Sequence, residues 1–516
     1  MAPLAQSLPI VAATVGDLLD AAAERRPEGT AVVFEGRRRT YGQLRDRVDR
    51  LADGLLAAGL RPGDRMALFL DNGDAAWELI LACARAGIIW VPMNYMLKAR
   101  ELAAIAGHAG ARGLAVSAAH WPAIEPVVGD LPVEVIVGVE GAPVGHDYER
   151  LIASSAPGRP AVRVEPDDIF ALLYTSGTTG LPKGTMLTHG SILAHARMAL
   201  REYRMTPDAV GLVVLPYFVG ATLNCIQIPG LSQGIPLVFN RKFSTEAFVD
   251  LIRAERVTHV QTVPTILVRL LESPDLERAD FSSIVTIGYG SAPMPVDRLR
   301  QLLARFGRIF TQIYGLTETC AMATVLRPEE HIPERLASCG RAAPGVEVRI
   351  VDGEIAIRGE TVMRGYWNAP EVTAEAIRDG WFLTGDLAEQ DADGYFYLGD
   401  RKKDMIITGG INVYPREVEE VLFSHPAVSD CAVIGLPDPE WGEAVTAVVV
   451  ANRAVAADEL IELCRRELAG YKKPRHVFFV DEIPRNPSGK VLKRLLRDRY
   501  AASGRRVSPS NKPRAC

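Results

Sequence analysis

The chain has 516 residues, of which 48% are apolar and 23% are charged. At about 150 residues per domain, this length predicts roughly two to four domains with a large buried core. The composition excludes wholesale disorder, collagen and coiled-coil arrays. There are 58 lysines and arginines against 63 acidic residues, and the net charge of −5 argues against a general nucleic-acid-binding surface.

The N-terminal segment and the cysteine pattern both favour a cytoplasmic protein. Residues 1–10 lack the basic segment of an export signal, and the charged residues Glu24–Arg26 interrupt the apolar stretch that follows. The seven cysteines show neither a C-x-x-C pair nor the spacing of a metal site. We therefore expect buried thiols in a reducing compartment rather than a disulfide framework.

Short β-branched runs alternate with helical patterns over most of the chain. Residues Arg65–Asp71 are typical of a strand, and Leu44, Val48 and Leu51 lie on one face of a helix before it. Further strand-like runs follow, each beside a helix-like stretch: Ile88–Met93, Ile169–Leu173, Gly211–Leu215, Ile235–Phe239, His259–Val263 and Ile284–Ile287. This alternation predicts parallel βαβ units with helices on both faces of each sheet.

One segment is long and apolar enough to raise the question of a membrane. Ala209–Asn240 contains no charged residue over 32 positions. Pro216, Pro229 and Pro236 interrupt it, however, and proline breaks helices. We therefore expect a buried strand, loop and helix that line a pocket, and no transmembrane span.

The pattern changes near residue 345. Three short runs indicate antiparallel strands: Val346–Val351, Glu354–Arg358 and Tyr395–Leu398. An α+β stretch follows Arg401, with helices and strands at Arg416–Ser424, Asp430–Ile434, Ala444–Ala451, Asp458–Ala469 and His476–Val480. We predict an α/β protein in which a large N-terminal domain, residues 1–401, combines βαβ subdomains with a small antiparallel barrel-like subdomain. A small α+β domain, residues 404–500, and a disordered tail, residues 501–516, complete the prediction.

The strongest local signal is the segment Tyr174–Gly184, which reads YTSGTTGLPKG. Its three glycines and four Ser/Thr hydroxyls form a flexible loop that can direct N–H and O–H groups at phosphate oxygens, and a lysine adds a cation. It is not a Walker A loop, because Gly184 follows Lys183 where that motif requires Ser or Thr. The predicted phosphate-binding residues are Thr175, Ser176, Gly177, Thr178, Thr179, Gly180 and Lys183.

This loop resembles the signature loop of the adenylate-forming (ANL) superfamily, which includes the acyl-CoA synthetases of the AMP-dependent synthetase and ligase family, free-standing adenylation enzymes and beetle luciferases. The remaining motifs of that family follow in order, and the resemblance covers the chain from Thr40-Tyr41 to Lys490. It implies ATP, Mg2+ and coenzyme A (CoA) as the cofactor set.

The resemblance assigns nucleotide contacts to two segments of the large domain. Tyr314-Gly315-Leu316-Thr317-Glu318 matches the YGxTE motif, which implies that Tyr314 packs against adenine, Thr317 contacts the α-phosphate and Glu318 binds Mg2+ through its carboxylate. The segment implied to lie on the other face of adenine consists of small residues that let backbone approach a flat base: Gly290, Ser291, Ala292 and Pro293.

Two further matches concern the ribose and the catalytic lysine. Thr384-Gly385-Asp386 resembles the motif whose aspartate accepts hydrogen bonds from the ribose hydroxyls, and Arg401 is implied as a second ribose contact. Lys490 lies in a segment that resembles the family's C-terminal catalytic loop. There its ammonium bridges the two anions that meet when a carboxylate attacks the α-phosphorus.

The same resemblance implies that the small domain is mobile. Asp400–Asp404 matches the hinge, placed at residues 402–403 with its pivot at Lys403. In one pose of the family the lysine loop serves adenylation. In the other, the strand of Gly409 and Gly410 reaches the site and leaves room for a pantetheine arm.

The predicted acid pocket departs from the family pattern. Val219 stands where a gating histidine is usual, so Phe218 or Tyr217 is expected to serve instead. Tyr289 and Met322 complete an apolar lining, which disfavours α-amino acids and dicarboxylates because an unpaired charge in an apolar pocket is costly. We predict a hydrophobic monocarboxylic acid: medium- or long-chain, aromatic or polycyclic.

The expected reaction converts this acid and ATP to an acyl-adenylate and pyrophosphate, and then transfers the acyl group to CoA with release of AMP. Thr317, Glu318 and Lys490 are the predicted catalytic residues. Alternatives that share these motifs are transfer to a carrier-protein pantetheine, an oxidase of the luciferase type and a nucleotide-binding pseudoenzyme. We expect no nucleic-acid partner, and a homodimer stays open.

Overall fold

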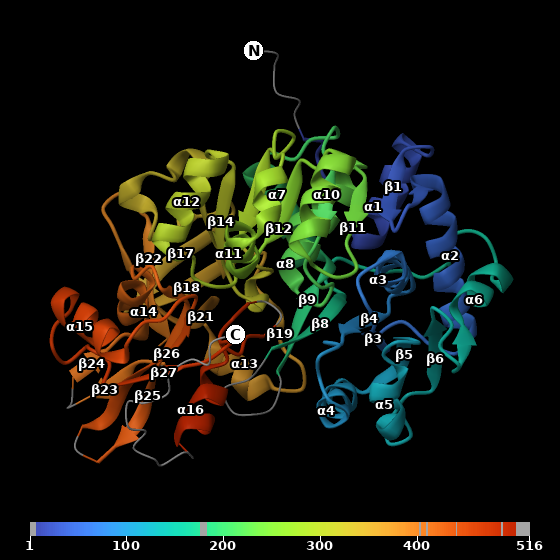
Figure 1. The fold of residues 1–516 in the computed structure, drawn as a ribbon. Coiled ribbons are helices and arrows are strands. Elements are labelled where there is room, and N and C mark those ends of the chain that lie inside the picture. Colours follow the sequence, from blue (N-terminus) through green and yellow to red (C-terminus); the bar gives the residue numbers. More distant parts are fainter. Residues whose placement is uncertain are drawn as a thin grey trace.

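The structure, a computed structural model, describes residues 7–175, 183–401, 404–408, 411–439, 441–486 and 489–501. Two large sheets carry most of the chain up to residue 401, and a third, smaller sheet follows them in sequence. The elements after residue 401, orange to red in Figure 1, lie together on the side opposite the blue N-terminal elements.

The first large sheet has nine strands. In spatial order they are β16 (Arg341–Ala342), β15 (Thr324–Leu326), β14 (Phe310–Tyr314), β13 (Thr286–Tyr289), β12 (His259–Thr262), β10 (Gly211–Val213), β11 (Leu237–Phe239), β1 (Thr30–Phe34) and β2 (Arg37–Thr40). The strands from β14 to β1 pair in parallel, as predicted. Both edges are antiparallel, which the prediction missed. At one edge, Glu35 and Gly36 both have positive φ, and this permits the tight hairpin of β1 and β2.

The second large sheet has eight strands. In spatial order they are β19 (Gly365–Tyr366), β9 (Lys183–Thr188), β8 (Ile169–Thr175), β4 (Ile89–Pro92), β3 (Arg65–Phe69), β5 (Ala111–Ser117), β6 (Val135–Val139) and β7 (His146–Asp147). The strands from β8 to β7 pair in parallel, whereas β9 and β19 add antiparallel. This antiparallel pair brings residues 365–366 beside Thr185 and Met186 in the middle of β9.

Helices cover both faces of both sheets, so the large domain has five layers. The central layer contains α1 (Val15–Arg25), α2 (Tyr41–Ala57), α3 (Asp74–Ala86), α7 (His189–Glu202) and α9 (Ile228–Gln233). The outer layers contain α10 (Thr245–Glu255), α11 (Pro264–Glu272) and α12 (Val296–Phe306) on the nine-stranded sheet, and α4 (Ala99–Ala109) and α5 (Trp121–Val128) on the eight-stranded sheet. Strand β3 shows the period of two: Met66 and Leu68 face the central layer, and Ala67 and Phe69 face the outer one.

The antiparallel subdomain is confirmed. It comprises β17 (Val346–Val351), β18 (Glu354–Gly359), β20 (Ile377–Arg378), β21 (Trp381–Gln390) and β22 (Phe396–Arg401). Strand β21 was missed, because its Thr384-Gly385-Asp386 triplet has the composition of a turn. The triplet lies within the strand, and the register with β22 shifts between Asp386 and Ala388.

The small domain is α+β, as predicted. Its five strands are β23 (Ile406–Thr408), β24 (Ile411–Val413), β25 (Val428–Asp438), β26 (Gly442–Ala451) and β27 (His476–Phe479). Its helices are α14 (Pro415–Phe423), α15 (Ala457–Glu467) and α16 (Lys493–Ala501). The first two cover one face of the sheet and α16 covers the other. Helix α16 was not predicted. The domain boundaries at 401 and 404 and the tail beyond Ala501 stay predictions.

The uncharged segment 209–240 folds as a strand, a loop and helices, as predicted. Three-residue α8 (Gly220–Thr222), the π-helix η1 (Leu223–Gln227) and α9 lie between β10 and β11. No helix in the described part of the chain has the length and apolar character needed to cross a bilayer. The six cysteines in that part are free and buried, as predicted; Cys516 lies outside it.

A buried arginine joins α1, α2 and α3 within the central layer. Arg85 on α3 has no exposed side-chain surface. It donates to both carboxylate oxygens of Asp20 on α1 at 2.6 and 2.7 Å, and its Nε lies 3.1 Å from Oδ1 of Asp49 on α2. Burial raises the pKa of Asp49, and Arg85 opposes that rise.

Substituting Arg85 with methionine should destabilise the large domain by about 3–5 kcal/mol, because it leaves Asp49 buried without its cation. The pKa of Asp49 in the folded chain is already raised, and it should rise further without Arg85. The loss of unfolding free energy should therefore be complete at pH 7 and become smaller as the pH falls through that raised pKa. Urea unfolding at several pH values measures both effects.

The matched control is Arg300→Met on α12, whose pair with Asp297 is exposed on both sides. This variant should cost less than about 1 kcal/mol and show no comparable pH dependence. Equal losses of unfolding free energy in the two variants would contradict a stabilising role for the buried Arg85 ion pairs.

Candidate functional site

Two of the predicted nucleotide-binding segments lie at one edge of the nine-stranded sheet. Parallel strands β10, β12, β13 and β14 all end there, and their carboxyl ends lead into residues 214–219, 263–264, 290–293 and 315–319. The carboxyl edge of an open parallel sheet is the usual place for a ligand in α/β proteins. The fold therefore brings together motifs that are up to about 100 residues apart in sequence.

Two glycines let the backbone at this edge come unusually close. A Cβ on Gly290 would lie 2.5 Å from the carbonyl oxygen of Ile313 in the neighbouring strand. A Cβ on Gly315 would lie 2.5 Å from the carbonyl oxygen of Ala321. Any side chain at either position would force these segments apart. Gly290 was predicted to let a flat base approach the backbone, and the structure adds a close backbone contact that requires the same residue.

Tyr314 and Asp386 form a buried pair between two sheets. Tyr314 ends β14 and its hydroxyl donates to Oδ2 of Asp386 in β21 at 2.9 Å. Both residues are buried, and burial followed by the charge of Asp386 raises the pKa of Tyr314 well above its usual value. The Asp386 backbone N–H also donates to Oγ1 of Thr384 at 3.1 Å, so the TGD triplet holds its own backbone at this position.

Glu318 lies in a short 3-10 turn directly after the Tyr314-Gly315 segment. Glu318 is buried, with 8% of its surface exposed. Its Oε1 accepts a hydrogen bond from the hydroxyl of Tyr366 at 2.8 Å, and its backbone carbonyl accepts one from the Met363 N–H at 2.8 Å. One segment, residues 363–366, therefore holds Glu318 by both backbone and side chain. Tyr366 could not be predicted from the sequence, because its partners are distant along the chain.

The turn that carries Glu318 is strained and clamped. Cys320 and Ala321 have φ values of +57° and +94°, which non-glycine residues rarely adopt. The Asn224 side-chain amide, on the π-helix η1, donates to the Cys320 carbonyl at 2.8 Å. π-Helical turns are rare and occur often at functional sites. Here the π-helix carries Asn224, whose side chain reaches the strained turn.

Lys183 is the one predicted phosphate-loop residue whose side chain is described. It starts β9, and its ammonium lies 5.1 Å from the centre of the Tyr366 ring. Residues 176–182, and with them Ser176, Gly177, Thr178, Thr179 and Gly180, lie outside the described residues. Thr175 is described only as the last residue of β8, without its side chain.

Lys490 lies at a tight turn of the small domain. The Lys490 N–H donates to Oδ1 of Asn486 at 2.8 Å, and the Asn486 N–H donates to the Lys490 carbonyl at 2.8 Å. Arg485 clamps the turn: its guanidinium donates to the Gly489 carbonyl at 2.7 Å and to Oδ1 of Asp430 on β25 at 2.7 Å. Arg485 belongs to the matched motif, yet nothing in the sequence indicates its partner Asp430.

The lysine turn contacts the large domain. An ideal Cβ on Gly489 would lie 3.4 Å from Oγ1 of Thr265 and 3.6 Å from the side chain of Val263. Val263 joins β12 to α11, and Thr265 lies in the first turn of α11, at the same sheet edge as Tyr314. Arg416 on α14 provides a second bond between the domains, since it donates to the Leu398 carbonyl at 2.9 Å. Lys403, Gly409, Gly410 and the side chain of Arg401 lie outside the described residues.

The five predicted acid-pocket residues do not share one environment. Tyr217 and Met322 belong to the central core, whereas Val219 and Tyr289 belong to the core beneath α10–α12. Phe218 is partly buried and packs against both cores. Of the five, it is the residue that stands at the boundary.

The neighbours of Tyr217 and Tyr289 limit what these two side chains can do. The Tyr217 hydroxyl donates to the Leu68 carbonyl and lies 3.1 Å from the Met93 carbonyl, so this ring is fixed between the two large sheets. The Tyr289 hydroxyl lies 3.0 Å from Nε2 of His331. Phe218 instead meets Tyr95 edge to face, with 5.1 Å between ring centres. It is the better candidate for a gate.

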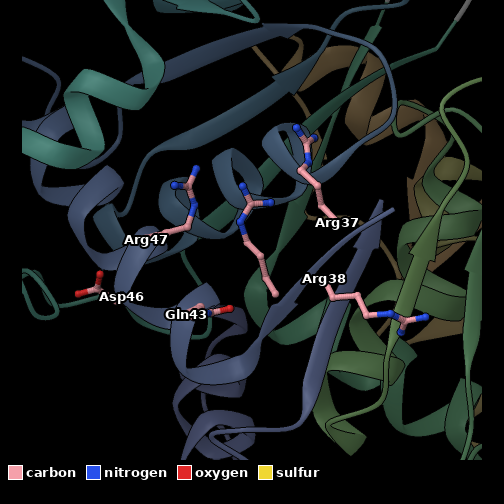
Figure 2. A pocket seen from close by; sticks show the side chains of 6 residues that line it. Arg37, Arg38, Gln43, Asp46 and Arg47 are labelled. Carbon is pink, nitrogen blue, oxygen red and sulfur yellow. The ribbon is translucent and has the colours of Figure 1, made fainter. Parts of the chain in front are cut away.

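A surface hollow also lies elsewhere on the large domain. A hollow of about 520 Å3 at the edge strand β2 and helix α2 is lined by Arg37, Arg38, Arg39, Gln43, Asp46 and Arg47 (Figure 2). Its arginines are already paired: Arg37 and Arg39 with Asp74, Arg38 with Glu255, and Arg47 with Glu78 and Glu149. These acids balance its charge, so the hollow is no open anion site.

Comparison with protein families gives two matches. The model of the AMP-binding enzyme family matches residues 19–367, and the model of the AMP-binding enzyme C-terminal domain matches residues 417–490.

Among curated proteins, a feruloyl-CoA synthase of Amycolatopsis sp is 41% identical over 491 residues, which is 93% of this chain and 97% of that protein. The fatty acid–[acyl-carrier-protein] ligase ScoC of Streptomyces coeruleorubidus is 37% identical over 94% of this chain and 96% of that protein. Among solved structures, the anthranilate CoA ligase AuaEII in complex with anthranoyl-AMP has a TM-score of 0.89 and 26% identity, with 96% of this chain and 99% of that one covered.

Removing the Arg485 clamp should loosen the lysine turn without unfolding the small domain. A hydrogen bond to a charged group contributes about 1.5–3 kcal/mol, so in Arg485→Met the Gly489 and Lys490 amides should exchange hydrogen at least about tenfold faster. Hydrogen–deuterium exchange with mass spectrometry measures this. Arg494→Met, on the exposed side of the adjacent helix α16, is the control and should leave the turn unchanged. Unchanged exchange in Arg485→Met would rule out the clamp.

Proposed function

The chain belongs to the AMP-binding enzyme family, and on that premise we propose that it activates a hydrophobic carboxylic acid with ATP and transfers the acyl group to CoA. The first half-reaction forms an acyl-adenylate and pyrophosphate, and the second forms acyl-CoA and AMP. The names of its relatives, which include a feruloyl-CoA synthase, support an acid–thiol ligase.

One observation carries this proposal: the turn of Lys490 packs on Val263 and Thr265, at the sheet edge where Tyr314 and Glu318 also lie. A lysine that comes from a separate domain to this edge is suited to bridge two anions. In the proposed first step, its ammonium offsets the charge that builds up as the acid carboxylate attacks the α-phosphorus. Positioning and charge stabilisation supply most of the rate enhancement.

The pair of Tyr314 and Asp386 supports a nucleotide role. An ionised carboxylate offers several acceptor sites, so Asp386 can accept from the Tyr314 hydroxyl and still accept from a ribose diol. The Tyr314 ring, the Gly290–Pro293 segment and Arg401 are proposed as the remaining contacts to adenine and ribose. Thr317, at the start of the Glu318 turn, is proposed to contact the α-phosphate.

Glu318 fits a divalent cation of the kind that accompanies ATP. The described residues contain no cluster of three acidic, His or Cys ligands. Mg2+ in such sites is usually bound by one or two carboxylates together with substrate phosphates, so a lone buried glutamate is compatible with it. The ion, when bound, would neutralise phosphate charge. Glu318 would orient it, and Lys183 would add a second positive charge near the phosphates.

The second half-reaction needs a different arrangement, because the lysine turn occupies the edge of the large domain. We propose that the small domain rotates about Lys403 and that the strand of Gly409 and Gly410 then faces the site. Pyrophosphate must leave before the thiol enters, and this order requires a conformational step. The hydrogen bond from Arg416 to the Leu398 carbonyl joins residues on either side of Lys403 in the sequence, so the proposed rotation would have to break it.

We propose aromatic and medium- or long-chain acids as substrates. Phe218 stands at the boundary of two apolar cores, and Val219 replaces the usual polar gate, so neither side chain offers a charge to a second carboxylate or an ammonium. The feruloyl-CoA synthase relative and the structural neighbour with bound anthranoyl-AMP both favour testing aryl acids first.

A second acceptor has one specific observation in its favour. The ScoC relative is named as an acyl-carrier-protein ligase and is nearly as similar to this chain as the CoA ligase relative. Transfer to a carrier-protein pantetheine uses the same thiol chemistry as transfer to CoA. The acceptor assay therefore has to include both.

The proposed function predicts acid-dependent AMP release across a graded acid panel. Cinnamic, benzoic, octanoic and palmitic acids should support release in the presence of CoA, whereas malonate and phenylalanine should support at least about tenfold less. Loss of free thiol on CoA addition identifies CoA as the acceptor. If free thiol is lost only with a phosphopantetheinyl carrier protein, the carrier protein is the acceptor. An absence of acid-dependent ATP–pyrophosphate exchange would favour a pseudoenzyme.

Lys490→Ala should separate the two half-reactions. Adenylation should fall by about 100-fold or more, because a charge-stabilising group is lost. Conversion of preformed acyl-adenylate to acyl-CoA should stay within about twofold of the parent enzyme. Single-turnover assays of each half-reaction test this, and Arg494→Ala on α16 serves as the control. Equal damage to both half-reactions would contradict the two-pose mechanism.

A further inference from the structure

Tyr366 links the two side chains that are proposed to meet the nucleotide phosphates. It ends the two-residue strand β19, and it is buried. Its hydroxyl donates to Oε1 of Glu318 at 2.8 Å. The face of its ring lies 5.1 Å from the ammonium of Lys183. The cation and the carboxylate are thus held by different parts of one aromatic residue.

The strand that carries Tyr366 is fixed by backbone bonds that do not involve its side chain. The Trp367 N–H donates to the Gly184 carbonyl at 2.8 Å, and the Arg364 N–H donates to the Met186 carbonyl at 3.0 Å. The Tyr366 N–H donates to Oγ1 of Thr373 at 2.9 Å. A substitution that removes only the hydroxyl therefore leaves the strand in place and removes the hydrogen bond to Glu318.

The two contacts can orient the Glu318 carboxylate and the Lys183 ammonium without neutralising either charge. A phenol hydroxyl is a neutral donor, so it orients the Glu318 carboxylate and leaves its charge uncancelled. No other described residue donates a hydrogen bond to this carboxylate. A cation–π contact with the ring is weaker than a direct ion pair, so Lys183 is restrained and still available to an anion.

We propose that Tyr366 is a positioning residue for the phosphate and metal side of the site. Its hydroxyl orients Glu318 toward the divalent cation of an ATP complex, and its ring holds the Lys183 ammonium where the phosphates bind. The proposal rests on the function proposed above. It goes beyond that function by assigning a role to a residue outside all the sequence motifs that we matched.

Two variants separate the two contacts. Tyr366→Phe keeps the ring and removes the hydroxyl, so binding of Mn2+ to the enzyme complex with a non-hydrolysable ATP analogue should weaken about tenfold. Binding of the analogue without metal should not change. Tyr366→Leu also removes the ring, so metal-free binding of the analogue should weaken about threefold as well. Electron paramagnetic resonance measures Mn2+ binding, and calorimetry measures nucleotide binding.

Activity gives an independent readout. The Mg2+ concentration for half-maximal ATP–pyrophosphate exchange should rise about tenfold in Tyr366→Phe, with little change at saturating Mg2+. Thioester formation from preformed acyl-adenylate should stay unchanged, because that step does not involve the pyrophosphate group or its metal. A merely structural role would lower both half-reactions together.

Tyr395→Phe is the matched control. The Tyr395 residue is also buried, and its hydroxyl donates to Oε1 of Glu330 at 2.9 Å, away from the proposed site. This variant should lose comparable stability and keep normal Mn2+ binding. Equal Mn2+ binding in Tyr366→Phe and the parent enzyme would overturn the proposal, as would equal losses in both Phe variants. A parent enzyme with neither exchange activity nor nucleotide-dependent Mn2+ binding would overturn the proposed function itself, and this proposal with it.

Discussion

Much of this structure depends on a steric constraint at the carboxyl edge of the nine-stranded sheet. The backbone after β13 and β14 comes so close to its neighbours that only hydrogen fits at Gly290 and Gly315. That closeness fixes where Tyr314 ends its strand and where the turn of Glu318 begins. The positive φ values of Cys320 and Ala321 and the hydrogen bond from the Asn224 side-chain amide to the Cys320 carbonyl lie in the same turn.

Buried carboxylates at and around the site share one solution. Asp386 receives a phenol hydroxyl from Tyr314, Glu318 receives one from Tyr366, and Glu330 receives one from Tyr395. A phenol satisfies a buried acceptor and leaves its charge uncancelled, whereas arginine would cancel it. At Glu330, outside the site, Arg341 also pairs with the carboxylate. Glu318 forms no ion pair with any described residue, which leaves its charge for a ligand.

The sequence predicted the parallel strands and the order of the motifs, because hydrophobic periodicity and short signatures are local properties. It missed β21, because Gly385 and Asp386 have the composition of a turn, and it missed the antiparallel edges, which depend on tertiary pairing. Tyr366 and Asp430 were also missed, since their partners Glu318 and Arg485 are 48 and 55 residues away. The acid-pocket set stays a prediction: its members belong to two neighbouring apolar clusters, and an apolar side chain gives the same sequence signal in a core as in a pocket wall.

The arginines of β2 have a consequence for the solubility of the fold. This strand is the outer edge of the nine-stranded sheet, and an edge strand is a template on which another polypeptide can add by backbone pairing. Arg37, Arg38 and Arg39 occupy three of its four positions, and each is held in ion pairs with acids on neighbouring helices. An incoming strand would have to displace long charged side chains to reach the backbone. The edge is therefore protected against intermolecular sheet extension.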